Sequence, residues 1–513
     1  MLQPIYDVFL SVSGADRGPG RELASELRAL GLRVFLDEDR IEPFTSITGG
    51  IQEALRSAKA LVAYYSTDYA ARPACQRELM TAFLAGQQEG DPCGRIMVIN
   101  PESDTGHLRP VELADARFAP LTDGVAEVAR QVAKRTASLE GTIGEVPPAR
   151  RPRRPAHRAG HMRDFTGRYR ELWDLHTALH AADFPLIEET ACGPFVSVCG
   201  LPGAGRTALV TTYARRFAAA FPGGICWVSL AGVAPDPDAL RERYARELRR
   251  FAAEIDVDLT RVADDRVAET VARELRFAGA ASLWVIDDIP DGLGPAVLDL
   301  LPLPAESGAR TVLISEEDAF RDLFPVVRVG PLPELDAVRL LDGYRLPDSE
   351  ADRQAQNDVV RGLGGNAGAL VAVGRHLRDR HGLSSYSSVA AEIDTIGDLT
   401  DAVFGGVRRV LDRMGPAELA LLRLADRTGV GVFPARLLAA LLPGHTTTEV
   451  GDALQRLSFR SAASRAGAVW RLDPLVVHAT RDPSRLYESP DSPETAIQGL
   501  EGARRFGPAS AGA

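Results

Sequence analysis

One short stretch near the middle of the chain limits what the whole molecule can fold into. Residues 195–210, FVSVCGLPGAGRTALV, join an apolar run that suits a buried strand to a glycine-rich turn and then to a helix. Gly200, Gly203 and Gly205 permit the tight left-handed backbone that turns amide N–H groups inward on a phosphate. Thr207 begins the helix, where its hydroxyl can ligate Mg²⁺ and the helix N-terminus favours anions. The stretch therefore predicts an α/β domain that binds a phosphate-bearing ligand.

The spacing of these glycines is that of the P-loop, G-x-x-x-x-G-K-[ST], with one departure. Arg206 occupies the position of the usual lysine, and Ala208 follows Thr207 in the expected helix. A planar guanidinium is larger than an ammonium and reaches phosphates differently. Because Lys59 and Lys134 are the only lysines of the chain, Arg206 also fits a general bias against lysine. The alternative interpretation is a Gly/Pro-rich loop that merely joins a strand to a helix.

Length and charge indicate a modular protein that is not drawn to polyanions. The 513 residues suffice for about three domains. The net charge of −11 gives no overall attraction to nucleic acid or to an anionic membrane, so binding to either would need a local positive patch. The five cysteines show no metal-binding spacing, and neither a signal peptide nor an apolar run of about eighteen residues is present. We therefore expect a cytoplasmic location.

Strands and helices alternate through the first hundred residues. Expected strands are 6–12, 32–36, 60–66 and 95–100, and the expected helices between them are 21–30, 47–58 and 75–85. This alternation predicts a parallel, doubly wound, flavodoxin-like sheet with helices on both faces. Ligands of such sheets bind at the carboxyl ends of the strands.

Three segments of the first domain, in this order, are YDVFLSVSGAD, VFLDEDRIEPFTSI and SAKALVAYYSTDYAARPACQREL. By these segments, their order and their spacing, residues 1–137 resemble the TIR domain (Toll/interleukin-1 receptor type) in its NAD-cleaving form. It implies that Glu78 is catalytic, since a carboxylate can stabilise the oxocarbenium-like cation that forms when the nicotinamide–ribose bond breaks. It also implies NAD⁺ as the substrate, with Ser13, Arg40, Glu42 and Ser46 as binding residues. The alternative is that Glu78 is a solvated helix carboxylate beside Arg77 in a domain that only scaffolds.

Residues 138–163 have the composition of a linker. Four prolines and five arginines occur between residues 147 and 158. We expect this segment to bury little apolar surface and to be semi-extended.

Residues 164–331 resemble the nucleotide-binding domain of STAND ATPases of the NB-ARC type. DFTGRYREL, with Gly167 and Arg168, is similar to the family's entry segment near the adenine, and the P-loop follows at the usual distance. The strand 283–286 ends in Asp287 and Asp288, a Walker B pattern. The resemblance implies that ATP or ADP binds with Mg²⁺, held by Thr207 and Asp287. The strand 311–315 is followed by Glu316, where the family usually has an arginine that contacts the γ-phosphate.

The remaining residues extend this resemblance through a small helical domain, 332–383, and a winged-helix domain, 384–484. GGNAGAL contains Gly368 where the family usually has leucine, and Asp473 replaces a histidine that contacts ADP. The candidate recognition helix has only Arg456 against Glu449 and Asp452, which argues against DNA binding. Residues 485–513 are expected to be a disordered tail.

The resemblance as a whole is to bacterial TIR–STAND proteins of antiphage immunity. It implies that the nucleotide-binding module self-associates and activates a TIR domain that hydrolyses NAD⁺ to nicotinamide and ADP-ribose or a cyclic product. The expected trigger is either a partner protein or a sensor segment missing from this sequence. The alternatives are a non-catalytic TIR adaptor and a STAND-type transcriptional regulator. Arg206, Glu316 and Asp473 each replace a family residue that interacts with the phosphates through its charge. The sequence therefore predicts slow hydrolysis and weak discrimination between ATP and ADP.

Overall fold

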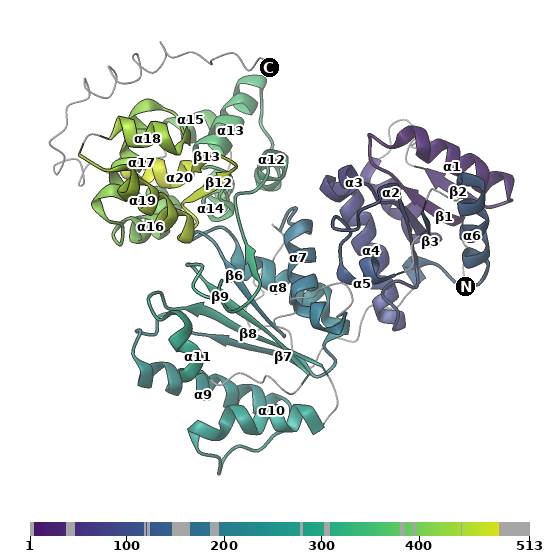
Figure 1. The fold of residues 1–513 in the computed structure, drawn as a ribbon, viewed down its shortest axis with the longest axis horizontal. Coiled ribbons are helices and arrows are strands. Elements are labelled where there is room, and N and C mark those ends of the chain that lie inside the picture. Colours follow the sequence, from purple (N-terminus) through teal and green to yellow (C-terminus); the bar gives the residue numbers. More distant parts are fainter. Residues whose placement is uncertain are drawn as a thin grey trace.

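The computed structural model describes residues 5–36, 47–116, 119–120, 124–145, 165–184, 194–277, 281–301, 308–379, 385–392, 397–442 and 444–481. Figure 1 shows three bodies: an N-terminal α/β domain, a central α/β domain, and a mainly helical C-terminal body that comprises residues 332–481. The expected tail, 485–513, lies outside the described residues, as does most of the expected linker. Within the described part of the chain, no helix is long and apolar enough to cross a membrane.

The N-terminal domain is built on a five-stranded parallel sheet in the order β2-β1-β3-β4-β5. Its elements are β1 (Tyr6–Ser11), α1 (Arg17–Ala29), β2 (Val34–Leu36), α2 (Ile47–Arg56), β3 (Ala58–Tyr64), α3 (Thr67–Ala71), α4 (Pro73–Glu89), β4 (Ile96–Asn100), α5 (Val111–Asp115), β5 (Ala119–Pro120) and α6 (Val125–Ala137). Val8 of β1 packs in one core with Leu23 of α1, whereas Phe9 packs in another with Leu79 of α4. Both faces of the sheet are thus covered, as in the predicted flavodoxin-like fold.

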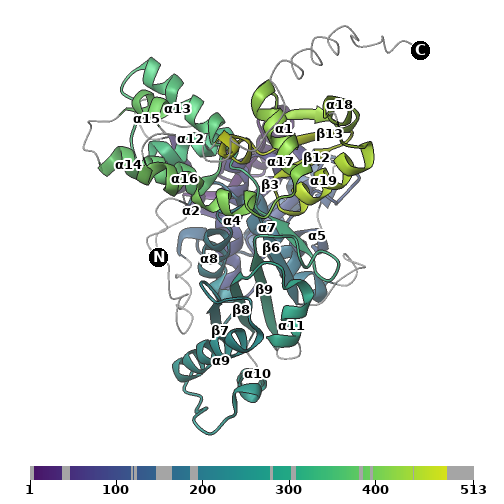
Figure 2. The same ribbon diagram turned by 90° about the vertical axis from the view of Figure 1, so that its left-hand side faces the viewer.

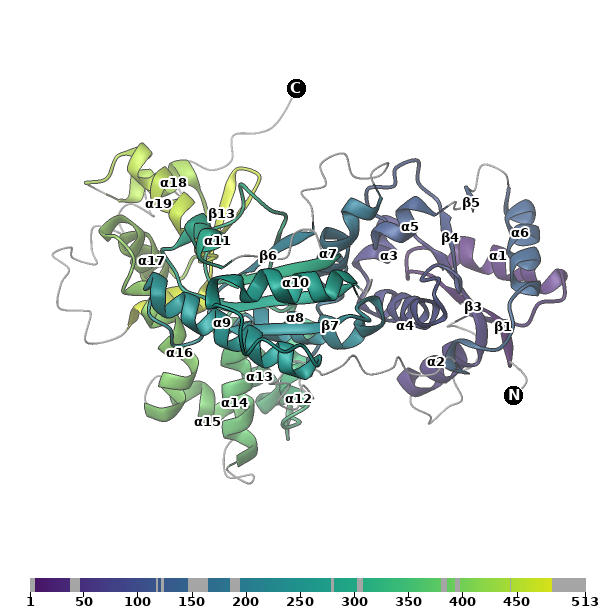
Figure 3. The same ribbon diagram turned by 90° about the horizontal axis from the view of Figure 1, so that it is seen from below.

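The central domain is a second five-stranded parallel sheet, in the order β10-β6-β9-β8-β7. Its elements are α7 (Tyr169–His180), β6 (Phe195–Cys199), α8 (Arg206–Arg216), β7 (Gly224–Ser229), α9 (Pro237–Glu254), α10 (Val267–Phe277), β8 (Ser282–Ile289), α11 (Val297–Leu300), β9 (Ala309–Ser315) and β10 (Val326–Arg328). Helices α9 and α10 cover one face, as Figure 3 shows, and α7 and α8 cover the other. The P-loop leaves β6 between β10 and β9, at the carboxyl edge of the sheet.

The C-terminal body has one hydrophobic core that runs from Leu332 to Ala479. Its elements are α12 (Glu334–Asp342), α13 (Glu350–Gly362), α14 (Ala367–Asp379), α15 (Tyr386–Glu392), α16 (Gly397–Leu411), α17 (Pro416–Thr428), β11 (Val432–Pro434), α18 (Ala435–Leu441), α19 (Thr447–Phe459), β12 (Ala463–Ala466), β13 (Val469–Leu472) and α20 (Pro474–His478). The strands form an antiparallel sheet in the order β11-β13-β12. Figure 2 shows α12–α15 to one side and α17–α19 with this sheet to the other. The boundary that the sequence places at residue 383 stays a prediction.

The candidate recognition helix α19 is tied to the body itself. Nε of Arg456 lies 3.5 Å from a carboxylate oxygen of Glu418, the residue that also pairs with Arg460 at 2.8 Å. An arginine held by a carboxylate adds little net positive charge for a phosphate backbone. The sequence argument against DNA binding itself stays a prediction.

The start of the expected linker is packed rather than extended. Ile143, in the 3-10 turn Ile143–Glu145, and Thr142 are buried, and Arg95 donates to the Glu140 carbonyl at 3.0 Å. The expectation that the linker buries little apolar surface is therefore wrong for residues 140–145. The reason is the single apolar residue Ile143, which joins the core under α2 and α4.

The N-terminal and central domains share a continuous apolar core. Phe83 of α4 meets Trp173 of α7 edge-on at 5.2 Å between ring centroids and lies 6.2 Å from the ring of Phe217. Phe83, Trp173 and Phe217 are almost fully buried. Figures 1 and 3 show α4 beside α7. The helix that carries Glu78 is therefore packed directly on the nucleotide-binding domain.

Candidate functional site

Glu78 lies at the carboxyl edge of the first sheet. Its side chain is in α4, is only 8% exposed, and accepts a 2.6 Å hydrogen bond from the hydroxyl of Ser11, the last residue of β1. In the strand order β2-β1-β3-β4-β5, the connection after β1 leads to a strand on one side and the connection after β3 leads to a strand on the other side. Ligands of such sheets bind at this switch point, between the carboxyl ends of β1 and β3. The alternative interpretation of Glu78 as a solvated carboxylate beside Arg77 is wrong, because α4 faces the sheet at this point.

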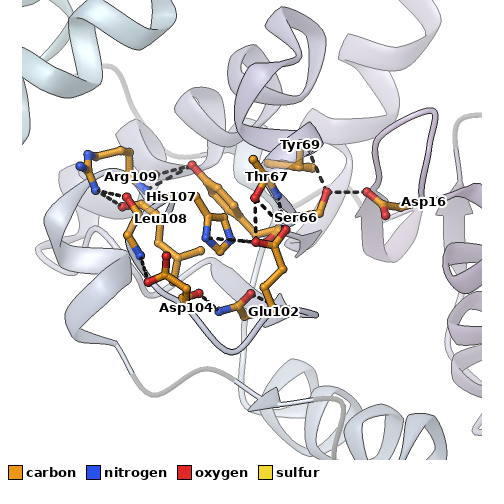
Figure 4. Close-up of polar contacts among 12 residues, drawn as sticks. Asp16, Ser66, Thr67, Tyr69, Glu102, Asp104, His107, Leu108 and Arg109 are labelled. Carbon is orange, nitrogen blue, oxygen red and sulfur yellow. Dashed lines mark hydrogen bonds and ion pairs between the residues drawn. The ribbon is translucent and has the colours of Figure 1, made fainter. Parts of the chain in front are cut away.

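Polar side chains around Asp16 line the same edge. Ser13 donates to Oδ2 of Asp16 at 2.6 Å and Ser66, which follows β3, donates to the same atom at 2.5 Å. Figure 4 shows Ser66 and Asp16 facing one another. Ser66 also caps α3, since its hydroxyl accepts the Tyr69 amide at 3.1 Å. The sequence indicated Ser13 but neither Asp16 nor Ser66, although the S-x-x pattern before α3 is a recognisable cap signal.

A second polar group extends this edge toward β4. The carboxylate of Glu102 accepts from the amide and the hydroxyl of Thr67 at 2.6 and 2.8 Å, and these bonds hold the pKa of Glu102 below its usual value. His107 lies beside Glu102, 3.7 Å from its carboxylate (Figure 4). The ring of His107 is also 2.9 Å from the Tyr65 carbonyl. The remaining predicted NAD-binding residues, Arg40, Glu42 and Ser46, lie outside the described residues.

The P-loop has the backbone that its glycines predict. Gly203 and Gly205 have φ values of +79° and +98°, which a residue with a side chain rarely adopts. Gly200 precedes them at the end of β6, and Ala208 lies half-buried in the first turn of α8. Together they place the N-terminus of α8 at the open edge of the second sheet, where it can receive a phosphate.

Thr207 and Asp287 come together as a pair that fits Mg²⁺. The Thr207 hydroxyl donates to Asp287 at 3.1 Å, although 80 residues separate them. Burial and the neighbouring charge of Asp288 raise the pKa of Asp287 to about 6. A hydroxyl and a buried carboxylate with this pKa form the kind of oxygen donor set that Mg²⁺ takes, and a bound cation would favour the ionised form. Asp288 is exposed, with φ +57°, and its amide donates to Asp287.

Arg168 organises the site through backbone carbonyls. Its guanidinium donates to the carbonyls of Gly330 at 2.6 Å, Ala204 at 3.1 Å and Pro331 at 3.3 Å, and to Glu171 at 2.7 Å. Gly167 before it is also left-handed. Arg168 therefore ties the P-loop to the segment that enters the C-terminal body.

The unexpected Gly368 has a steric cause. Its amide donates to the Gly203 carbonyl at 2.7 Å, and a Cβ at this position would lie 2.8 Å from Gly203 Cα. Asn366 adds a 3.0 Å bond to the Pro202 carbonyl. A leucine at residue 368 would push α14 off the P-loop, so the departure from the family pattern allows direct contact between the two.

Asp473 lies in the wall of a cavity of about 430 Å³ next to the P-loop. The cavity runs from Leu201 and Ala204 to Arg465 and Arg471 of the third sheet. Asp473 caps α20 by accepting the amides of Leu475 and Val476 at 3.0 and 3.2 Å.

Burial raises the pKa of Asp473 to about 7, and the two amides only partly offset this effect. With this pKa, Asp473 carries only part of a negative charge near neutral pH.

Glu316 lies between two arginines rather than alone. One oxygen is 3.6 Å from Arg206 of the P-loop and the other is 2.9 Å from Arg413 of the C-terminal body. Arg413 also pairs with Asp291. The sequence did not indicate Arg413, because nothing local relates residues 97 positions apart.

Comparison with known proteins identifies the first domain. A family model described as TIR domain matches residues 8–133. No curated protein matches the chain.

Among solved structures, similar ones include a Walker-type ATPase of Pyrococcus abyssi (16% identity, 64% of this chain and 98% of that one, TM-score 0.45). Another is a STAND protein with a tetratricopeptide repeat sensor from Pyrococcus horikoshii (13% identity, 67% of this chain and 46% of that one, TM-score 0.31). A third is the ADP form of the ORC2 protein of Aeropyrum pernix (14% identity, 64% and 93% coverage, TM-score 0.34). Because the TM-scores are below 0.5, these likenesses say nothing specific about this chain. The chain carries a TIR domain at its N-terminus, and its own parallel sheet and P-loop backbone make the second domain a P-loop α/β fold.

Proposed function

We propose that the TIR domain cleaves NAD⁺ between nicotinamide and ribose, and that the nucleotide-binding module controls this activity by self-association. The single observation that supports catalysis is the buried Glu78 carboxylate at the edge between β1 and β3, held by Ser11. A carboxylate in a water-poor site stabilises developing positive charge far more than one in water.

The proposed reaction needs a counter-charge and no general acid. The bond between ribose C1′ and the nicotinamide nitrogen breaks, and its electron pair leaves with neutral nicotinamide. The cation that remains on the ribose is stabilised by Glu78 and then captured by water, which releases a proton and gives ADP-ribose, or by an adenine nitrogen of the same molecule, which gives a cyclic product. Ser11 keeps the carboxylate in place, and Ser13, Asp16 and Ser66 supply polar groups for ribose hydroxyls.

Control by the second module is supported by the packing of α4. Because Phe83 of this helix shares a core with Trp173 and Phe217, any rearrangement of the central domain reaches the helix that holds Glu78. Heterologous contacts between nucleotide-binding modules would build a ring or filament and bring TIR domains together. We propose a role in cytoplasmic immune signalling, with a partner protein as the trigger.

The test measures free nicotinamide released from NAD⁺ by the purified full chain, with and without Mg-ATP and over a range of protein concentrations. We expect Glu78→Gln to lower release on the order of a hundredfold or more, since the change removes charge and keeps shape. Glu53→Gln, an exposed carboxylate of α2 in the same domain, is the matched control and is expected to leave release unchanged.

Three outcomes would count against parts of this proposal. Equal release by wild type and Glu78→Gln would remove Glu78 from the mechanism. If the wild type releases no nicotinamide at any concentration, the non-catalytic adaptor becomes the better description. A strictly linear dependence on concentration would argue for a site complete in one chain.

A further inference from the structure

The charged contact between the P-loop and the C-terminal body contains a cation that the sequence pattern does not assign. Glu316 directly follows β9, and the register of the second sheet pairs Ser315 with Cys199, the residue before the P-loop. Glu316 is therefore at the level of the phosphate cradle. Arg206 of the P-loop and Arg413 approach its two oxygens at 3.6 and 2.9 Å.

Arg413 is held near the P-loop by more than this ion pair. It follows α16, and a Cβ on Gly406 of that helix would lie 2.8 Å from the side chain of Pro202 in the P-loop. The second carboxylate partner of Arg413, Asp291, comes from the turn after β8, the strand that carries Asp287. Arg413 is thus placed between the ends of β8 and β9, the edge where the Mg²⁺ donors also lie.

The carboxylate of Glu316 is shared between two arginines. One of its oxygens approaches Arg206 and the other approaches Arg413, which also pairs with Asp291. A terminal phosphate carries more charge than a carboxylate and offers three acceptor oxygens, and guanidinium binds it bidentately. A phosphate at this edge can therefore take both arginines from Glu316.

We propose that Arg413 is a second phosphate-binding cation of the nucleotide site, delivered by the C-terminal body, and that it contacts the terminal phosphate of a nucleoside triphosphate. It supplies the charge that the family's sensor position lacks in this chain. Glu316 pairs both arginines in the absence of that phosphate. The inference rests on the proposed binding of nucleotide and replaces the sequence-based expectation of weak ATP–ADP discrimination.

Isothermal titration of the full chain with Mg-ATP and with Mg-ADP tests this assignment. A charge-assisted hydrogen bond is worth enough that we expect Arg413→Ala to weaken ATP binding about tenfold or more and to change ADP binding less than about twofold. Arg427→Ala, an exposed arginine of α17 in the same body, is the matched control and should change neither affinity.

If Arg413 only held the C-terminal body against the P-loop, its removal would weaken ATP binding and ADP binding by the same factor. Equal losses for the two nucleotides, or no loss for ATP, would overturn the assignment. Should Arg413→Ala fail to fold, Glu316→Gln keeps the shape and frees both arginines, so ATP affinity should rise several-fold more than ADP affinity. An unchanged ratio in that variant would also overturn the assignment. Both readouts are affinities, so they stand or fall independently of nicotinamide release.

Discussion

The central domain makes two contacts of opposite character with its neighbours. Toward the TIR domain it presents aromatic rings, and Phe83, Trp173 and Phe217 form a closed cluster. Toward the C-terminal body it presents ion pairs, among them Arg413–Glu316 and Arg460–Glu317. The first contact is driven by removal of apolar surface from water and does not depend on a ligand. The second is made of ion pairs, and under the proposal for Arg413 a phosphate competes with Glu316 for one of them. The difference indicates which of the two contacts a bound nucleotide would rearrange: the C-terminal one.

The apolar contact should be broken by removing a single ring. Phe83→Ala deletes a large buried side chain at the centre of the cluster, and such changes cost about 3–5 kcal/mol. We expect faster hydrogen exchange in both α4 and α7. Phe9→Ala is the matched control, since Phe9 is equally buried but stacks on Phe35 within the TIR domain at 5.2 Å. If Phe83→Ala leaves exchange in α7 unchanged, the two domains are not joined through this ring.

The same contrast marks how far the sequence could predict the structure. Strands and helices follow from local periodicity, so the doubly wound fold and the P-loop backbone could be predicted. Thr207 and Asp287 could be paired because each lies in a local motif. Gly368 looked like a departure because the surface it meets, Gly203, is remote in sequence. The contacts of Glu78 with Ser11 and of Glu316 with Arg413 depend on packing between elements, which no local pattern encodes.

Lowering the pH and raising the salt concentration, each in a separate experiment, should affect the two contacts differently. His176 lies between Glu112 and Tyr213, with its ring nitrogens 2.8 and 2.9 Å from their oxygens. Burial would raise the pKa of Glu112, but His176 outweighs it and the pKa is lowered; burial and His176 also lower the pKa of His180. Both groups are thus deprotonated more readily in the folded chain.

The sign of the pH effect follows from these shifts. The unfolded chain takes up protons first as pH falls below 6.5 for His180 and below 4.5 for Glu112. The stability they contribute is present above these values and is lost on acidification. Salt should act on the other contact, since the Debye length falls from ~10 Å at about 0.1 M to ~3 Å at about 1 M.

Amide hydrogen exchange, corrected for the pH dependence of the intrinsic exchange rates, measures both effects. Acid should speed exchange in α4 and α7 more than in the loop after α16, and salt should do the reverse. The effects should be smaller than that of Phe83→Ala, because no buried surface is deleted. Equal responses of the two contacts to salt would show that the TIR contact is also electrostatic.

The smallest effect is expected at Asp473, and it tests whether this carboxylate of the C-terminal body is paired with an arginine. Asp473 has its pKa raised to about 7 from 3.8, mainly by burial, so the unfolded chain loses this proton first as pH rises. Its contribution to stability is present below about 3.8 and is lost as pH rises through about 7.

Asn caps helices as well as Asp and carries no charge. Asp473→Asn should therefore stabilise the chain by ~1 kcal/mol near pH 8. This is well below the free energy that corresponds to the whole pKa shift, because the Asp473 side chain keeps some access to water. The gain should be smaller at pH 5 than at pH 8 and should vanish only below about 3.8, and urea unfolding at pH 8 and pH 5 would measure the decrease. A loss of stability at pH 8 would mean that Arg465 or Arg471 in the same cavity wall holds the carboxylate, and that the C-terminal contact uses this charge as it uses Glu316.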